Sequence, residues 1–122
     1  MLFLRRLFFG ILVALLPAFA IHEYGHLQEF RKRNIPVEEF SLGIGPKLIG
    51  FKTDVCMVNI RAIPLAAYVK PTAEGVDLWE KLPVYDQFMI SFAGIRNNLI
   101  AGLLLLFAVQ WYAWRKKIHI AE

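Results

Sequence analysis

Two long apolar stretches lie toward the two ends of the chain, and a segment punctuated by glycine and proline separates them. In the first stretch, residues 7–21 are uncharged and almost wholly apolar, and 24 residues separate Arg6 from Arg31. As a helix, 24 residues extend about 36 Å, which is enough to cross a bilayer with some tilt. The sequence therefore predicts a first transmembrane helix over residues 3–30.

The second apolar stretch predicts a transmembrane helix over residues 87–114. Eighteen uncharged residues separate Arg96 from Arg115, and a belt of interfacial aromatic residues closes the stretch at Trp111, Tyr112 and Trp114. Arg96 lies near the beginning of this helix, and its long side chain is expected to extend toward the lipid headgroups.

The middle segment, residues 35–70, has the composition of a small sheet. Two runs of residues that favour strands, 47–51 and 55–60, flank the turn-like triplet Lys52-Thr53-Asp54 and predict a β-hairpin. Residues 63–69 follow as an extended segment, and Pro64 favours an edge strand because it has no N–H to donate. Such an edge could pair with an extended peptide, or the sheet could simply cover the end of the first helix.

Residues 71–86 are polar and are interrupted by Pro71, Gly75 and Pro83, which predicts a surface linker with one short amphipathic turn around Trp79. The hydrophobic fraction of 57% exceeds the roughly 45–50% typical of soluble domains, and the mean hydropathy is +0.48. The predicted fold is an α-helical integral membrane protein. It forms one domain over residues 1–122, with two transmembrane helices flanking a small segment that contains a β-hairpin.

The basic residues lie mainly beside the apolar runs, so the net charge of +4 indicates membrane-flanking anchors and no nucleic-acid partner. Residues 31–86 contain eight Lys and Arg residues, and the two tails contain five. The positive-inside rule therefore places residues 31–86 in the cytoplasm and the chain, as a multi-pass protein, in the plasma or inner membrane. The single cysteine, Cys56, excludes an intrachain disulfide.

The candidate chemistry lies in residues 22–26, His-Glu-Tyr-Gly-His. On a helix, His22 and His26 lie on one face and can bind one zinc ion, and Glu23 lies beside them. A carboxylate next to a metal-activated water can take its proton, which is the chemistry of the His-Glu-x-x-His pattern. The pattern also occurs by chance in soluble helices, but these groups directly follow an apolar span, where polar side chains are costly unless they have a function.

A signal peptide is the alternative interpretation of the N-terminus. Arg5 and Arg6 precede the apolar stretch, and Ala18-Phe19-Ala20 has the small-residue spacing of a cleavage site. Cleavage after Ala20 would remove most of the first predicted helix.

Four ordered motifs resemble those of the site-2 protease family of intramembrane zinc metalloproteases. Residues 22–26 match H-E-[FYL]-G-H, and residues 40–45, FSLGIG, match F-S-x-G-x-G. Residues 63–69, IPLAAYV, are similar to I-P-L-G-G-Y-V with alanine for both glycines. Residues 93–98, AGIRNN, are similar to A-G-P-x-x-N with isoleucine for the proline. Together the motifs cover most of the chain, as the N-terminal part of the family core.

The resemblance implies that His22 and His26 bind Zn²⁺ and that Glu23 is the general base. It implies a membrane-associated β region that holds substrate in extended form and an Asn98 side chain near the site. The expected substrate-binding residues are Asn98, Ile63, Leu65 and Tyr68.

The family's third zinc ligand is an aspartate in an Asp-Gly motif on a later helix, and this sequence contains no Asp-Gly pair. Among the acids present, Glu29, Asp77 and Asp86 are poor candidates because of their basic neighbours or their place in the linker. We therefore expect a partner subunit to supply an aspartate.

Two functions follow as hypotheses. The first is a zinc-dependent intramembrane metalloendopeptidase, whole or split, that acts on a membrane-spanning substrate helix. The alternative is a non-catalytic relative that binds membrane helices or regulates a true protease. Zinc binding that is lost on His22→Ala would favour the first.

Overall fold

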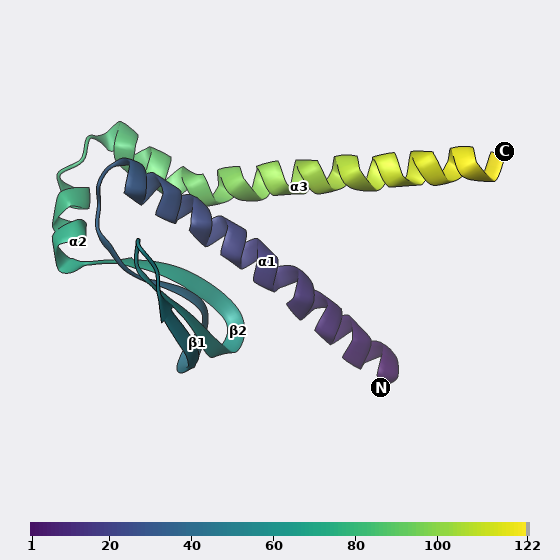
Figure 1. The fold of residues 1–122 in the computed structure, drawn as a ribbon, viewed down its shortest axis with the longest axis horizontal. Coiled ribbons are helices and arrows are strands. Elements are labelled where there is room, and N and C mark those ends of the chain that lie inside the picture. Colours follow the sequence, from purple (N-terminus) through teal and green to yellow (C-terminus); the bar gives the residue numbers. More distant parts are fainter. Residues whose placement is uncertain (122) are drawn as a thin grey trace.

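The structure is a computed structural model that describes the backbone of residues 1–121 and the side chains of residues 1–119. Two long helices meet where the first ends and the second begins, and they diverge toward the two termini (Figure 1). A two-stranded antiparallel sheet lies beside the first helix. The elements in chain order are α1 (Leu2–Lys32), β1 (Val37–Lys52), β2 (Met57–Pro71), α2 (Ala73–Glu80) and α3 (Val84–Ala121).

Helix α1 begins and ends within two residues of the predicted limits, and its C-terminus is closed by a Schellman motif. Asn34 takes the left-handed conformation at φ 56°, which asparagine tolerates better than most residues. The Ile35 N–H donates to the Phe30 carbonyl at 3.0 Å, and the Asn34 N–H donates to the Arg31 carbonyl at 3.1 Å. The same turn brings Ile35 onto Phe30 in the hydrophobic core, which fixes where the chain enters the sheet.

The predicted hairpin is present, but both strands are longer than predicted and each is folded back on itself. Residues 39–42 pair on one side with residues 57–60 and on the other with residues 67–70. Residues 49–52 pair with the far side of residues 57–60. The spatial order is thus 49–52, 57–60, 39–42 and 67–70. The extended segment predicted over 63–69 belongs to β2. Residues 67–70 of β2 lie at one edge of this arrangement.

The FSLGIG motif forms the bend that allows β1 to fold back. Gly43 and Gly45 have φ of 95° and 85°, which residues with a Cβ rarely adopt. A Cβ at Gly43 would also lie 2.9 Å from the carbonyl oxygens of Arg61 and Ile63. The Ser41 hydroxyl donates to the Gly43 carbonyl at 2.8 Å, and the Arg61 guanidinium donates to the Gly45 carbonyl at 2.9 Å. The motif therefore has a structural role in shaping the sheet.

Residues 71–86, predicted as a linker, contain helix α2 and the first residues of α3. The Thr72 side chain caps α2 by accepting from the Gly75 N–H at 3.0 Å, so the predicted turn around Trp79 is a two-turn helix. Helix α3 begins directly after Pro83 and carries Asp86 in its first turn, where an acid is favourable. It continues through the basic residues 115–117, which suit the C-terminal part of a helix.

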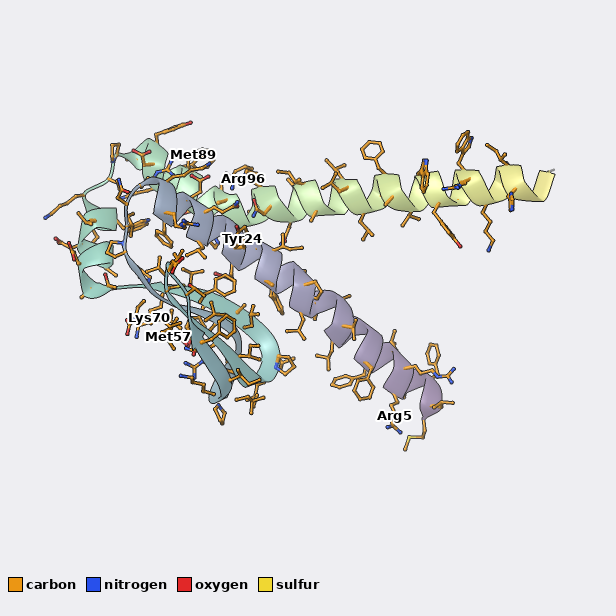
Figure 2. The ribbon with its side chains drawn as sticks, in the orientation of Figure 1. Arg5, Tyr24, Met57, Lys70, Met89 and Arg96 are labelled. Atoms are coloured by element: carbon orange, nitrogen blue, oxygen red, sulfur yellow. The ribbon has the colours of Figure 1, made fainter. Side chains whose placement is uncertain are left out.

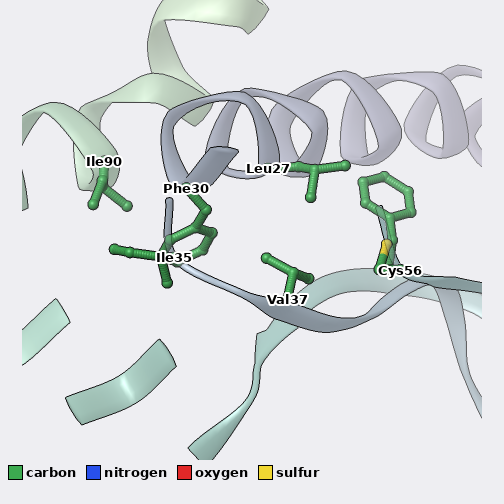
Figure 3. Close-up of a cluster of buried hydrophobic side chains, with 7 residues drawn as sticks. Leu27, Phe30, Ile35, Val37, Cys56 and Ile90 are labelled. Carbon is green, nitrogen blue, oxygen red and sulfur yellow. The ribbon is translucent and has the colours of Figure 1, made fainter. Parts of the chain in front are cut away.

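The hydrophobic core lies where α1, the sheet and α3 meet (Figure 3). Its buried members are Leu27, Phe30, Ile35, Val37, Phe40, Cys56 and Ile90. Outside this region the two long helices are exposed, and their side chains project freely (Figure 2). Leu2–Lys32 and Val84–His119 are both long and apolar enough to cross a membrane.

Candidate metal centre

Three side chains of α1 form the candidate metal centre. One ligand atom each from His22, Glu23 and His26 lie within 4.8 Å of one another, and all three residues are half-buried. The centroids of the two imidazole rings are 4.9 Å apart. Helical spacing places the histidines one turn apart, as the sequence predicts. Among residues 1–119 this is the only such group of histidine, cysteine and acidic residues.

Helix α3 contacts both imidazole rings. His26 Nδ1 lies 2.7 Å from the carbonyl oxygen of Ile90. Because a carbonyl only accepts, this hydrogen bond requires the proton on Nδ1 and leaves the Nε2 lone pair of a neutral ring available. Metal-binding histidines usually donate their second nitrogen in this way. His22 Nδ1 lies 3.3 Å from the side-chain amide nitrogen, Nδ2, of Asn98. The donor set and this outer contact fit a zinc ion.

Two glycines allow α1 and α3 to approach this closely. A Cβ at Gly25, inside the HEYGH motif, would lie 2.8 Å from the carbonyl carbon of Ala93 and closer still to its oxygen. A Cβ at Gly94 would overlap the His22 ring. Each motif thus carries a glycine that makes room for the other motif. Both glycines belong to motifs that the sequence analysis identified. Spacing along one helix, however, could not show which residues of the other helix they contact.

The edge of the sheet reaches the same site. The backbone N–H of Val69 faces the Glu23 carboxylate. Val69 is paired with Phe40 on its other side, so the edge of β2 that carries residues 67–70 faces α1. Of the predicted substrate-binding residues, Asn98 lies beside His22, whereas Ile63 and Leu65 lie further along β2 and are 41% and 56% exposed.

Tyr68, the fourth predicted substrate-binding residue, takes part in a polar cluster within the sheet. Its hydroxyl donates to Glu39 Oε1 at 3.2 Å, and the Asn59 amide donates to the same oxygen at 2.8 Å. Arg61 forms an ion pair with Glu39. Burial alone would raise the pKa of Glu39, but these hydrogen bonds, first that of Arg61, outweigh it and hold the pKa below 4.5.

A buried ion-pair network lies one turn beyond His26. Sequence reasoning expected basic neighbours to pair with Glu29 but missed the members that α3 contributes. The Glu29 side chain is only 2% exposed and pairs with Arg96 of α3 at 2.6 Å and with Arg33. Arg33 in turn pairs with Asp86 at 3.1 Å. The expectation that Arg96 extends toward lipid headgroups is therefore wrong. The buried carboxylate of Glu29 provides a stronger partner than solvent for its guanidinium.

The three acids considered as a further zinc ligand within the described chain are all engaged in other ion pairs. Glu29 and Asp86 are engaged by arginines, and Asp77 pairs with Lys81 at 3.0 Å on the exposed face of α2. The prediction that these three acids are poor zinc ligands agrees with their positions. The described residues bring together two imidazoles and one carboxylate, whereas a catalytic zinc site usually has three protein ligands and an open position.

A His-Glu-x-x-His group on one face of a helix is an arrangement typical of zinc metalloproteases. The sequence profile of Peptidase family M50 matches residues 10–120. The chain belongs to this family, that of the site-2 proteases. Family membership and the two apolar helices both point to a membrane protein.

Three relatives illustrate the similarity, and each bears the name "Putative zinc metalloprotease". That of Fusobacterium nucleatum is 33% identical over 94 residues, which cover 71% of this chain and 27% of the relative. That of Synechocystis sp. is 33% identical over 106 residues, or 80% and 28%. That of Clostridium acetobutylicum is 45% identical over 66 residues, or 52% and 20%. The chain thus spans about a quarter of the length of these relatives.

Proposed function

We propose that this chain forms the part of a zinc-dependent intramembrane metalloendopeptidase that carries the general base and two zinc ligands. The observation that supports this most directly is the grouping of His22, Glu23 and His26 on a helix of membrane-crossing length. In this proposal His22 and His26 hold zinc. When bound, zinc would polarise the scissile carbonyl and acidify a water molecule.

Glu23 performs the proton transfers. Its carboxylate takes the proton of the attacking water and then delivers a proton to the nitrogen of the departing peptide segment. The carboxylate lies beside the two imidazoles, within the same 4.8 Å group, so a water held at the site is in reach of it. Helix α3 keeps the imidazoles in place while the proton moves.

The edge of β2 holds the substrate. Outward N–H and C=O groups alternate along a strand, and the Val69 N–H faces Glu23, so Ala67 and Leu65 present the next outward groups. A membrane-spanning substrate that unwinds locally can add to this edge as a further strand, with its scissile bond near Glu23. The small side chains of Ala66 and Ala67 leave room beside the edge, and Ile63, Leu65 and Tyr68 are the proposed side-chain contacts.

A third zinc ligand is proposed to come from another subunit, as an aspartate on a membrane helix. The test is the zinc content of the purified chain and its cleavage of a membrane-helix substrate, with and without a co-expressed partner. The expected result is weak, His22-dependent zinc binding by the chain alone and cleavage only with the partner. Robust cleavage by the chain alone, unaffected by Glu29→Gln, Asp77→Asn and Asp86→Asn, would exclude a ligand supplied in trans. Absence of zinc in every preparation would favour a non-catalytic helix-binding relative.

The two apolar helices are proposed to cross the plasma or inner membrane, with residues 31–86 on the cytoplasmic side. The turn after β1 offers a labelling position at Asp54, which is exposed, whereas the Thr53 hydroxyl holds the turn through the Cys56 carbonyl at 2.7 Å. In a Cys56→Ala background, Asp54→Cys should resist a membrane-impermeant thiol reagent in intact cells and react after lysis. Labelling in intact cells would reverse the orientation.

A further inference from the structure

We infer that Asn98 is a positioning residue that fixes the orientation and tautomer of His22, rather than a residue that contacts substrate. The inference rests on the proposed function, because it concerns the readiness of His22 to bind zinc. Its basis is the 3.3 Å contact between Asn98 Nδ2 and His22 Nδ1, which places the side-chain amide of Asn98 directly against the ring nitrogen.

The two histidines meet α3 through the same ring atom. His26 Nδ1 contacts the Ile90 carbonyl, and His22 Nδ1 contacts Asn98, eight residues and about two turns further along α3. One face of α3 thus contacts both rings. Since the Ile90 carbonyl can only accept, His26 has its proton on Nδ1 and its lone pair on Nε2.

Asn98 can supply His22 with the equivalent acceptor. The oxygen and nitrogen of a side-chain amide occupy nearly interchangeable positions, so either can face Nδ1. With the oxygen toward Nδ1, Asn98 accepts the Nδ1 proton and leaves the Nε2 lone pair of His22 free. With the nitrogen toward Nδ1, the proton of a neutral ring lies on Nε2, and that nitrogen cannot bind a metal. In the structure the nitrogen faces Nδ1, and a half-turn of the amide exchanges the two atoms without moving either helix. The inferred metal-competent site has the first arrangement, with the oxygen toward Nδ1.

The His22 ring packs against α3, and the contacts there indicate the function of Asn98. Gly94 packs directly against the ring from the same helix, so α3 sets its position with Gly94 and its rotation with Asn98. The neighbouring amide, Asn97, serves helix packing instead. It donates to the Ile21 carbonyl at 3.3 Å and to Gln28 Oε1 at 3.1 Å, and it contacts neither histidine. Asn97 is therefore a matched control of the same residue type on the same helix.

The first test measures the affinity for Zn²⁺ by chelator competition, with the full chain in lipid nanodiscs. Asn98→Ala should weaken binding about 10- to 100-fold, as for other residues that orient a metal-binding histidine. Asn98→Asp should bind at least as tightly as the wild type, because a carboxylate also accepts the Nδ1 proton. Asn97→Ala should leave the affinity unchanged. An unchanged affinity in Asn98→Ala, or equal losses in Asn98→Ala and Asn97→Ala, would overturn the inference.

The second test needs no metal. ¹⁵N NMR of the histidine-labelled, metal-free chain, at a pH where the ring is neutral, reports which nitrogen of His22 is protonated, and His22→Gln identifies its signals. We expect the proton on Nδ1 in the wild type and in Asn97→Ala, and a mixture of tautomers in Asn98→Ala. A proton on Nε2 in the wild type overturns the inference while leaving the proposed function intact. A wild type that binds no zinc, even with the partner, overturns both.

Discussion

The inner junction of α1 and α3 and the outer parts of the same two helices are built in opposite ways. At the junction Ala93 is fully buried, Glu29 is 2% exposed, and polar side chains link the two helices. Toward the termini the helices diverge (Figure 1). Apolar side chains there, such as Leu104 and Phe107, are 65% and 70% exposed. The junction thus holds its geometry through its own contacts, whereas the outer parts require apolar surroundings, which a bilayer or other membrane helices would provide.

This difference concentrates function at the junction. Every residue of the candidate metal centre lies there, and the helices approach closely only there. Polar groups are tolerated in an apolar setting when they pair with one another or have a function. At the junction the Glu29 carboxylate is paired with arginines, and a function is proposed for the three residues of the candidate metal centre. Substitutions at the junction should therefore have large effects, and equivalent substitutions in the outer parts or on exposed faces should have small ones.

The largest effect is expected from Glu23→Gln. The substitution preserves the shape of the side chain but removes the proposed general base, so the rate of substrate cleavage by the complete protease should fall by about 10²–10⁴-fold while zinc content is retained. The matched control is Tyr24→Phe, the adjacent exposed residue, which should cleave at the wild-type rate. Cleavage by the Glu23 variant at the wild-type rate would disprove the assignment of the base.

The next effect concerns stability. Glu29→Gln leaves Arg96 without its carboxylate in a partly buried setting and removes one of the two carboxylates that pair with Arg33. Loss of one member of a buried ion pair typically costs about 3–5 kcal/mol. The free energy of unfolding in detergent should fall by that amount. Asp77→Asn, which removes the exposed pair with Lys81, should cost only about 0–1 kcal/mol. Similar losses of unfolding free energy in both variants would show that the ion pairs of the junction stabilise the chain no more than an exposed ion pair does.

A smaller effect distinguishes the glycines of the two regions. Gly25→Ala forces a Cβ against the Ala93 carbonyl and should destabilise the chain by about 1–3 kcal/mol. A Cβ at Gly10 or Gly102 meets nothing within 4 Å, so alanine there should be neutral or stabilise the helix by up to about 1 kcal/mol. Denaturation of the three variants in the same detergent measures the loss of stability at Gly25 and the neutral or stabilising effect at Gly10 and Gly102. A Gly25→Ala variant as stable as Gly102→Ala would mean that the helices can separate freely at the junction.

Local patterns in the sequence were sufficient for the elements and for part of the site. The apolar stretches predicted both long helices, the triplet at 52–54 predicted the hairpin turn, and the HEYGH motif predicted the histidine pair. The resemblance to the family placed Asn98 near that pair. Each of these inferences depends on residues close together in sequence or on an ordered set of motifs.

The parts that could not be predicted depend on contacts between distant residues. Residues 39–42 pair on both sides, with 57–60 and with 67–70. The composition of β1 does not show this, because a strand that pairs on one side only would have the same sequence pattern. Arg96 looked like a lipid anchor because it borders an apolar stretch, yet Glu29, 67 residues away, lies next to it. Helix α2 was predicted only as one short turn around Trp79, because the Thr72 cap is a single polar residue among prolines and glycines.

The smallest predicted effect lies outside both helices, in the polar cluster of the sheet, and it depends on pH. The pKa of Glu39 is lower in the folded chain than its ordinary value of 4.5, so folding favours the ionised carboxylate. Its contribution to the free energy of unfolding is complete above pH 4.5. It decreases as the pH falls toward the folded-state pKa and is absent below that value. The wild type should therefore lose its advantage over Glu39→Gln in this acidic range.

The measurement is the thermal midpoint of the wild type and of Glu39→Gln in detergent across the acidic range. Glu38→Gln is the matched control, because Glu38 lies next in the strand, is 57% exposed and pairs only loosely with Lys70 at 3.7 Å. We expect its difference from the wild type to be small and nearly independent of pH. If the Glu39→Gln difference were equally flat, the contacts of Glu39 with Arg61, Asn59 and Tyr68 would not favour the ionised form.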